Sequence, residues 1–384
     1  MTVAAILAAA TVTMLSGRGG GGEALPERIV PGLEDRINDV ARITLVQGEE
    51  RLELSRDQGE WVVASKGGYP ARFEPVKELI IGVANLAPRE RKTANPQLHQ
   101  RLGLGAPGED DEATGVTLLD DSGAEIASVV LGKSTSGAGA GRFVRVAGAE
   151  QTWLAAADVN VRLDPMTWME RELVRLDRAR VARVTIDHPG AAPLELVRDD
   201  AGQFAPVDLP PDRQAKSSEL SQVAGAASYI GMSDVRKADA PPPDGAVVTM
   251  FEAEDGMTLA ITTWSEGDDW WASFEVTSPE GAGDAPQPEP DDAAAADAGA
   301  EPAAEEPAAG ESPDPAAEAA ALRDKLAGWA FKIEPFKATQ LRKALDELTE
   351  AAEPAGEGPV IGPPGPAQPE EPLGPVLPPA GGGR

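Results

Sequence analysis

An internal duplication constrains the fold of this 384-residue chain more than any other feature of its sequence. The run VARIT at residues 40–44 returns as VARVT at 181–185, an offset of about 141 residues. The run LELSRD at 52–57 then returns as LELVRD at 194–199. The pairs occur in the same order, and each copy continues with a glycine and an aromatic residue. This order of identities predicts two tandem copies of one structural unit.

Within each copy the hydrophobic period changes from that of a strand to that of a helix. In the first copy Ala41, Ile43 and Leu45 alternate with polar residues, which is typical of a strand with one buried face. Between residues 76 and 86 the apolar residues recur at helical spacing on one face. The stretch 217–230 occupies the same place in the second copy and is richer in Ala and Ser.

Paired apolar runs follow the expected helix in both copies. In the first copy Ser122-Gly123 separates two such runs, and in the second copy Asp255-Gly256 does. A Gly in such a pair indicates a hairpin, because it supplies the positive φ that a tight turn needs. We therefore expect an α+β fold of two tandem repeats, each a mainly antiparallel sheet with a covering helix.

The composition divides the chain into five parts. An apolar segment at 1–22 precedes a first repeat at 38–175 and a second repeat at 179–350. The second repeat contains an acidic insertion at 279–320, rich in Asp, Glu and Pro and without Lys or Arg. Such a segment buries too little apolar surface to offset chain entropy, so we expect disorder there. We expect the same of the tail at 351–384, which is rich in Pro and Gly.

The N-terminal segment has two interpretations. Residues 2–16 are uncharged and mostly apolar, but the run is shorter than the about 20 residues that span a bilayer. Its length matches the apolar region of a secretory signal or a marginal anchor. No Lys or Arg precedes the run, so the alternative is an apolar N-terminus of a cytoplasmic protein. The first interpretation predicts a protein anchored in the inner membrane and facing the periplasm.

The charge and the rare residues exclude several classes of function. Asp and Glu number 64 against 34 Lys and Arg, giving a formal net charge of −30. This argues against nucleic-acid binding, which needs a basic face, and against docking on anionic lipid. The chain has no Cys and two His, so thiolate chemistry is excluded and histidine chemistry has few residues available. We assign no catalytic, cofactor-binding or metal-ligating residue and expect a protein that is not an enzyme.

Several short motifs resemble functional sites, and each has a plainer interpretation. Residues 132–134, GKS, resemble the end of a phosphate-binding loop, but a strand is expected next rather than a helix, so we expect a β-turn. Acidic residues at 110–112 and 268–269 do not fit the spacing of a calcium loop, and we expect solvated loop charge. His99 and His188 lack an evident partner in the sequence, and we expect both on the surface.

Three tryptophans form the one candidate binding surface. Trp270 and Trp271 are adjacent in an expected strand, close in sequence to Trp264. Neighbouring side chains of a strand point to opposite faces, so one of the pair must leave the core side. That tryptophan is either a binding surface or is covered by a helix around Trp329, and we favour the covered arrangement.

Six segments carry a family resemblance: residues 40–44, the run from 52 to Trp61, RLGL at 101–104, Leu131-Gly132, FVR at 143–145 and WAFKI at 329–333. In this order they resemble the bacterial envelope family known as domain of unknown function 4340. The resemblance implies an exported, membrane-anchored domain, and it associates the protein with ABC transport systems of the gliding type. It carries over no catalytic residue.

Two functional hypotheses follow. The leading one is a non-catalytic, membrane-associated protein of the cell envelope that serves an ABC-type transport system and contacts its integral membrane subunits. The alternative is a standalone periplasmic module that binds a ligand or peptide in the groove between the repeats, near Trp264 and Trp271. An enzyme ranks third, because no nucleophile with a matching base can be recognised in the sequence.

Overall fold

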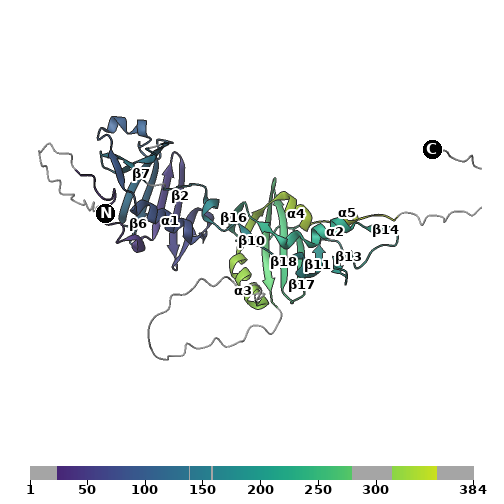
Figure 1. Cartoon of the computed structure of the whole chain (residues 1–384). Coiled ribbons are helices and arrows are strands. Elements are labelled where there is room, and N and C mark those ends of the chain that lie inside the picture. The colour runs from purple at the N-terminus through teal and green to yellow at the C-terminus, as the bar shows by residue number, and fades with distance from the viewer. Residues whose placement is uncertain (1–23, 138, 157–158, 279–313, 353–384) are drawn as a thin grey trace, which may run out of the picture.

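The computed structural model describes residues 24–137, 139–156, 159–278 and 314–352 (Figure 1). The expected apolar segment at 1–22 lies outside these residues, as do residues 279–313 of the acidic insertion and residues 353–384 of the tail. Among the helices of the described ranges, none is long and apolar enough to cross a membrane.

The first large sheet is antiparallel and has nine strands, in the order β4-β3-β2-β1-β6-β7-β8-β9-β5. Most neighbours in the sheet are also neighbours along the chain, and they pair through hairpins. The strands are β1 (Arg42–Gln47), β2 (Glu50–Asp57), β3 (Glu60–Val63), β4 (Tyr69–Pro70), β5 (Pro88–Arg91), β6 (Thr114–Leu119), β7 (Glu125–Thr135), β8 (Gly141–Val146) and β9 (Thr152–Ala155).

Helix α1 (Phe73–Ala84) covers one face of this sheet (Figure 1). Its buried side chains include Val76, Leu79 and Val83, which recur at the helical spacing that the sequence indicated. The strands supply the other side of the core by alternation, and β6 buries every second residue. The helix expected from residue 76 to 86 ends at Ala84, and Leu86 is buried just beyond it.

The second large sheet is also antiparallel and has eight strands, in the order β13-β12-β11-β17-β18-β19-β20-β16. Two small sheets, β10-β15 and β14-β21, flank it. The strands are β10 (Glu172–Val174), β11 (Val181–Asp187), β12 (Leu194–Arg198), β13 (Phe204–Pro206), β14 (Arg213–Ala215), β15 (Ile230–Gly231), β16 (Asp234–Lys237), β17 (Val247–Ala253), β18 (Thr258–Glu266), β19 (Asp269–Thr277), β20 (Trp329–Ile333) and β21 (Thr349–Ala351).

Four α-helices pack against the second sheet. α2 (Ser217–Ala224) contacts β11 and β13, α3 (Pro315–Leu326) contacts β19 and β10, and α4 (Pro335–Leu341) contacts β19. The short α5 (Leu345–Leu348) contacts α2. Seven 3-10 helices complete the described elements: η1 (Ile37–Asp39), η2 (Ala64–Lys66), η3 (Pro96–Leu98), η4 (Gln100–Leu102), η5 (Pro165–Trp168), η6 (Arg178–Arg180) and η7 (Ala226–Ser228). The described residues therefore form a mixed α+β fold dominated by antiparallel sheets.

The C-terminal elements differ from the sequence expectation in two places. The last part of the expected insertion is helical, because α3 begins at Pro315 with the Asp314 side chain capping its first turn. Trp329 lies in strand β20 rather than in a helix. Beyond β20, α4 ends at Leu341 and α5 begins only at Leu345, because Arg342 leaves helical geometry and donates to the Thr263 carbonyl at 2.6 Å.

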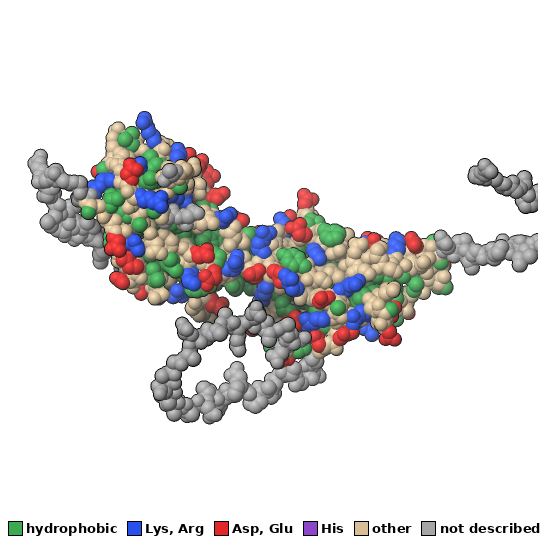
Figure 2. Space-filling model, viewed as in Figure 1, with side chains coloured by type: hydrophobic (Ala, Val, Ile, Leu, Met, Phe, Trp, Pro, Cys, Tyr) green, Lys and Arg blue, Asp and Glu red, His purple; other side chains and the backbone are tan. Residues whose placement is uncertain are grey.

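The two large sheets lie end to end in an elongated body (Figure 1). The Lys66 ammonium pairs with Asp234 at 2.6 Å across the junction, and the Arg72 amide donates to the Trp168 carbonyl at 2.7 Å. One hydrophobic core cluster includes buried side chains of both sheets. Positive and negative side chains are interspersed over both halves of the visible face (Figure 2). Because one core cluster contains buried side chains of both sheets, the sheets form one continuously packed body.

Candidate functional site

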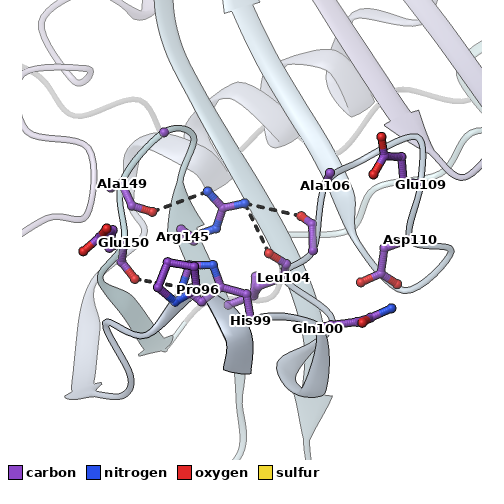
Figure 3. A pocket seen from close by; sticks show the side chains of 12 residues that line it. Pro96, His99, Gln100, Leu104, Ala106, Glu109, Asp110, Arg145, Ala149 and Glu150 are labelled. Carbon is purple, nitrogen blue, oxygen red and sulfur yellow. Dashed lines mark hydrogen bonds between the residues drawn. The ribbon is translucent and has the colours of Figure 1, made fainter.

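A pocket of about 560 Å³ opens beside the turn between β8 and β9 in the first sheet (Figure 3). Three chain segments line it: the 3-10 turns around His99, the loop from Leu104 to Asp110, and β8 with its following turn from Arg145 to Glu150. The loop and β8 include parts of the RLGL and FVR motifs that carry the family resemblance. Sequence spacing did not indicate that these motifs would meet at one pocket.

Local signals in the sequence shape the first of these segments. The Asn95 side chain accepts a hydrogen bond from the Gln97 amide at 3.1 Å and so caps η3, with Pro96 at its first position. Gly103 then takes a positive φ of 66° and ends η4. These two turns set the direction in which Leu104 and the following loop approach the strands.

Gly132 allows this loop to cross strand β7. A Cβ at Gly132 would lie 2.3 Å from the Leu102 carbonyl oxygen, a distance at which the backbone would have to move. Glycine inside a strand commonly marks such a close backbone approach. The expected β-turn at residues 132–134 is wrong, because these residues lie within β7, at an irregularity in its pairing with β8. The strand then continues through a hairpin into β8, not into a helix.

Arg145 extends from β8 into the pocket (Figure 3). Its Nη2 donates to the carbonyls of Leu104 and Gly105 at 3.2 and 3.3 Å, and its Nη1 donates to that of Ala149 at 3.4 Å. Its Nε is buried without a hydrogen-bond partner in the described residues. Burial lowers the pKa of this guanidinium, because desolvation disfavours the charged form. No carboxylate of the described residues forms an ion pair with Arg145.

Asp110 lines the same pocket and is 9% exposed. Its Oδ1 accepts from the Glu112 amide at 3.0 Å, whereas its Oδ2 is buried with no hydrogen-bond partner among the described residues. A Cβ at Gly105 would lie 2.4 Å from Oδ2, so only glycine leaves room for the carboxylate. The expectation that the acidic run at 110–112 is solvated loop charge is therefore wrong for Asp110.

The two histidines have different surroundings. His99 is 7% exposed, and its Nε2 donates to the Glu150 carbonyl at 2.9 Å, which ties η4 to the β8–β9 turn. The expected surface position of His99 is wrong, because the segment folds over this turn. His188 follows β11 in a turn, and its Nε2 is buried without a partner in the described residues.

The sequence model of one protein family, described as "Domain of unknown function (DUF4340)", matches residues 61–246. This stretch is similar to the DUF4340 family. No curated protein and no solved structure matches the chain. The DUF4340 match contains the whole pocket around Arg145 and confirms the family resemblance found in the sequence.

The three candidate tryptophans lie beyond the DUF4340 match, in the second sheet. Trp264 and Trp271 are buried and paired across β18 and β19, and Trp270 is half-buried on the opposite face. The Arg236 guanidinium lies 4.0 Å from the centre of the Trp271 ring, and Arg342 lies 5.0 Å from that of Trp270. Arginine side chains therefore stack on Trp270 and Trp271. The expected cover by a helix around Trp329 is wrong, because Trp329 lies in strand β20.

A second pocket of about 350 Å³ borders Trp264. The loop from Ala238 to Pro243 forms one wall, and Glu266, Ser273 and Ala330 complete it. All of these residues belong to the second half of the chain, so this pocket lies within that half. Asp269, in the acidic run at 268–269, pairs with Lys332 at 2.7 Å. Within the described ranges, no group of three or more His, Cys, Asp or Glu residues is placed to hold a metal ion.

Proposed function

We propose that this chain is a non-catalytic, membrane-associated protein of the cell envelope that serves as an auxiliary component of an ABC-type transport system. The resemblance to DUF4340 proteins, which implies an association with gliding-type transporters, supports this role. We further propose that residues 1–22 anchor the chain in the inner membrane and that the folded part faces the periplasm. The partners would be the integral membrane subunits of the transporter.

The observation that supports this role most directly is the packing between the two sheets. The Tyr69 ring of the first sheet lies among the side chains of β20 in the second, and Lys66 pairs with Asp234 beside it. A continuous core of this kind resists bending between the halves, unlike a flexible linker. An elongated body of fixed shape suits a subunit that holds other proteins at a set distance.

The polar groups of the pocket around Arg145 also favour a non-catalytic role. The Nε2 of His99 is engaged with the Glu150 carbonyl, and the Nη atoms of Arg145 are engaged with three main-chain carbonyls. A histidine that acts as a general base uses a ring nitrogen that reaches the nucleophile or a substrate proton. In this pocket the histidine instead joins two loops.

We also propose that the two halves are tandem repeats of one unit. The order of seven pairing strands in the first sheet, β3-β2-β1-β6-β7-β8-β9, has the same connectivity as β13-β12-β11-β17-β18-β19-β20 in the second. The edge strands β5 and β16 extend the match, and each follows the first long helix of its half. In this alignment residues 278–328 replace the short turn between β8 and β9, so the acidic stretch is an insertion in the second repeat.

Co-purification from cells tests the proposed role. A C-terminally tagged chain would be cross-linked in intact cells, and its partners identified from the detergent-solubilised membrane fraction. We expect stoichiometric recovery of an ABC permease or its extracytoplasmic partner. A chain lacking residues 1–22 is the control, and we expect it to lose both the membrane fraction and the permease. Recovery of the full-length chain alone, from the soluble fraction, would contradict the role.

A standalone ligand- or peptide-binding module is the second candidate. The pocket beside Trp264 favours it, because an indole, a guanidinium and a carboxylate meet there in one concave surface. This role predicts a saturable thermal shift with a component of cell extract and no dependence on a membrane complex. A Trp264→Ala variant that retains the fold should lose that shift.

A further inference from the structure

We propose that the pocket around Arg145 binds a small zwitterion, such as an amino acid or a dipeptide. The carboxylate of the ligand would pair with Arg145, and its ammonium group would pair with Asp110. This inference concerns a binding site in the first sheet and does not depend on the transporter role proposed above.

The surroundings of Arg145 favour the binding of an anionic group. Three main-chain carbonyls hold its Nη atoms, while Nε keeps an unused N–H and no carboxylate of the described residues neutralises the charge. A partly buried charge without a counter-ion is costly, and an oxyanion that accepts from the guanidinium lowers this cost. The carboxylate of a ligand supplies such an oxyanion.

The surroundings of Asp110 favour the binding of a cationic hydrogen-bond donor. Its Oδ2 has no hydrogen-bond partner in the described part of the chain, and the residue is more than nine-tenths buried. An unsatisfied buried carboxylate oxygen is among the most expensive polar groups to leave unpaired. An ammonium group brings both the missing donor and the opposite charge.

The two charges share one pocket but do not pair with each other. Both groups lie close to Gly105: Arg145 donates to its carbonyl at 3.3 Å, and Asp110 Oδ2 lies 2.4 Å from the position that a Cβ would take there. Both residues line the pocket, and no Arg145 nitrogen forms an ion pair with Asp110 among the described residues (Figure 3). A single molecule that satisfies both must carry a cation and an anion. Amino acids and dipeptides have this arrangement.

The size and lining of the pocket suit such a ligand. Its volume of about 560 Å³ lies within the range of small-molecule sites and leaves room for a ligand side chain. Pro96, Leu104 and Ala149 give it apolar surface. The exposed Glu109 and Glu150 also line the pocket, and their negative charge would attract the ammonium end.

Titration calorimetry on the full chain tests the proposal. The zwitterionic probes are glycine, leucine, lysine and diglycine, and the single-charge controls are N-acetylglycine, which lacks the ammonium, and glycinamide, which lacks the carboxylate. We expect saturable binding of at least one zwitterion, with each control about 10- to 100-fold weaker, as expected for losing one charge-assisted hydrogen bond.

Two substitutions locate the site. Asp110→Asn keeps the acceptor for the Glu112 amide but removes the charge, so we expect zwitterion affinity to fall at least about 10-fold while N-acetylglycine binding stays unchanged. Arg145→Gln should weaken both. Arg51→Gln is the matched control, because Arg51 is 62% exposed and pairs with Glu53 on the same sheet, and it should leave binding unchanged.

Three results would overturn the proposal. One is the absence of saturable heat with every zwitterion up to about 10 mM, well above the weakest useful affinity. Another is equal binding of the zwitterions and both single-charge controls. The third is unchanged zwitterion affinity in Asp110→Asn, a near-isosteric change that decides the outcome even if Arg145→Gln fails to fold.

Discussion

The ring of Tyr69, on strand β4 of the first sheet, packs edge-on against the ring of Trp329, on strand β20 of the second, with 5.0 Å between the ring centroids. Phe331 contacts the same tyrosine ring at 5.9 Å, again edge-on. Edge-to-face pairs add to the stabilisation that comes from burying the rings. Tyr69 therefore joins the cores of the two sheets.

Truncating this tyrosine should weaken the junction. Tyr69→Ala removes a buried ring, so we expect the free energy of unfolding to fall by about 3–5 kcal/mol, measured by urea denaturation. The other tyrosine of the chain gives a matched control, because Tyr229 is 49% exposed, and Tyr229→Ala should cost about 1 kcal/mol or less. Equal losses in the two variants would show that Tyr69 does not join the cores.

The same side chain makes the free energy of unfolding depend on pH in the alkaline range. Burial, with a smaller contribution from the negative charge of Glu170, raises the pKa of Tyr69 from 10.0 to about 12. The folded state therefore keeps the phenolic proton at pH values where the unfolded chain releases it. Stability from this group is complete well below pH 10 and is lost as the pH rises through 12, by at most about 2.7 kcal/mol in total.

Tyr69→Phe isolates this contribution. The phenylalanine variant lacks the ionisable group, so its stability should fall less than that of the wild type between pH 10 and 12. Urea denaturation at a series of pH values compares the two. Parallel curves over this interval would contradict the raised pKa.

The hydrophobic periodicity of the sequence was sufficient to predict strands and the first helix, but not the contact between the two large sheets. Val76, Leu79 and Val83 share a face because side chains three and four residues apart lie together on a helix, and this requires no tertiary information. The contact between Tyr69 and Trp329 joins residues far apart in the chain. A hydrophobic pattern shows that both are apolar, but it does not identify the partner of either.

Arg180 forms a clamp between helix α3 and the second sheet. The Arg180 guanidinium donates to both oxygens of Glu318 on α3, at 2.9 and 2.8 Å, and to Asp255 at 2.7 Å. We expect Arg180→Gln to lower the free energy of unfolding by about 1–2 kcal/mol, because these partly buried carboxylates would lose their counter-ion. Limited proteolysis should then cut first within α3.

An exposed ion pair provides the comparison for this clamp. Arg175 pairs with Glu172 at 2.6 Å in a similar two-bond arrangement, but its side chain is 71% exposed. Arg175→Gln should therefore cost less than about 0.5 kcal/mol. If the two variants lose the same stability, the clamp at Arg180 has no special role.

A substitution at Gly132 tests whether strand β7 requires a glycine at this position. Gly132→Ala places a Cβ against the Leu102 carbonyl, and we expect a loss of about 1–3 kcal/mol and faster amide exchange in the loop that follows. Gly139 lies in the next hairpin and has nothing within 4 Å of its Cβ position. Gly139→Ala should therefore be nearly neutral, and a similar loss there would contradict the close approach.

The pocket, unlike the strands, could not be predicted from the sequence. The acidic run at 110–112 predicted solvated charge, since most Asp side chains are exposed. Asp110 is buried because Gly105 leaves space for its carboxylate, and that space exists only after the loop has folded over β7. The FVR motif identified Arg145 as part of a recurring pattern, but the three carbonyls that it binds come from two different loops. No spacing in the sequence relates them.

The proposed place of the chain in a transporter is tested most directly by the mass of the particle that leaves the membrane. The tagged full-length chain would be solubilised in mild detergent and measured by native mass spectrometry, without cross-linking. An auxiliary subunit should appear in a particle whose mass equals one or two copies of this chain plus an ABC permease and its ATPase. A particle with the mass of this chain alone, at every detergent concentration that keeps the permease intact, would contradict the proposed function.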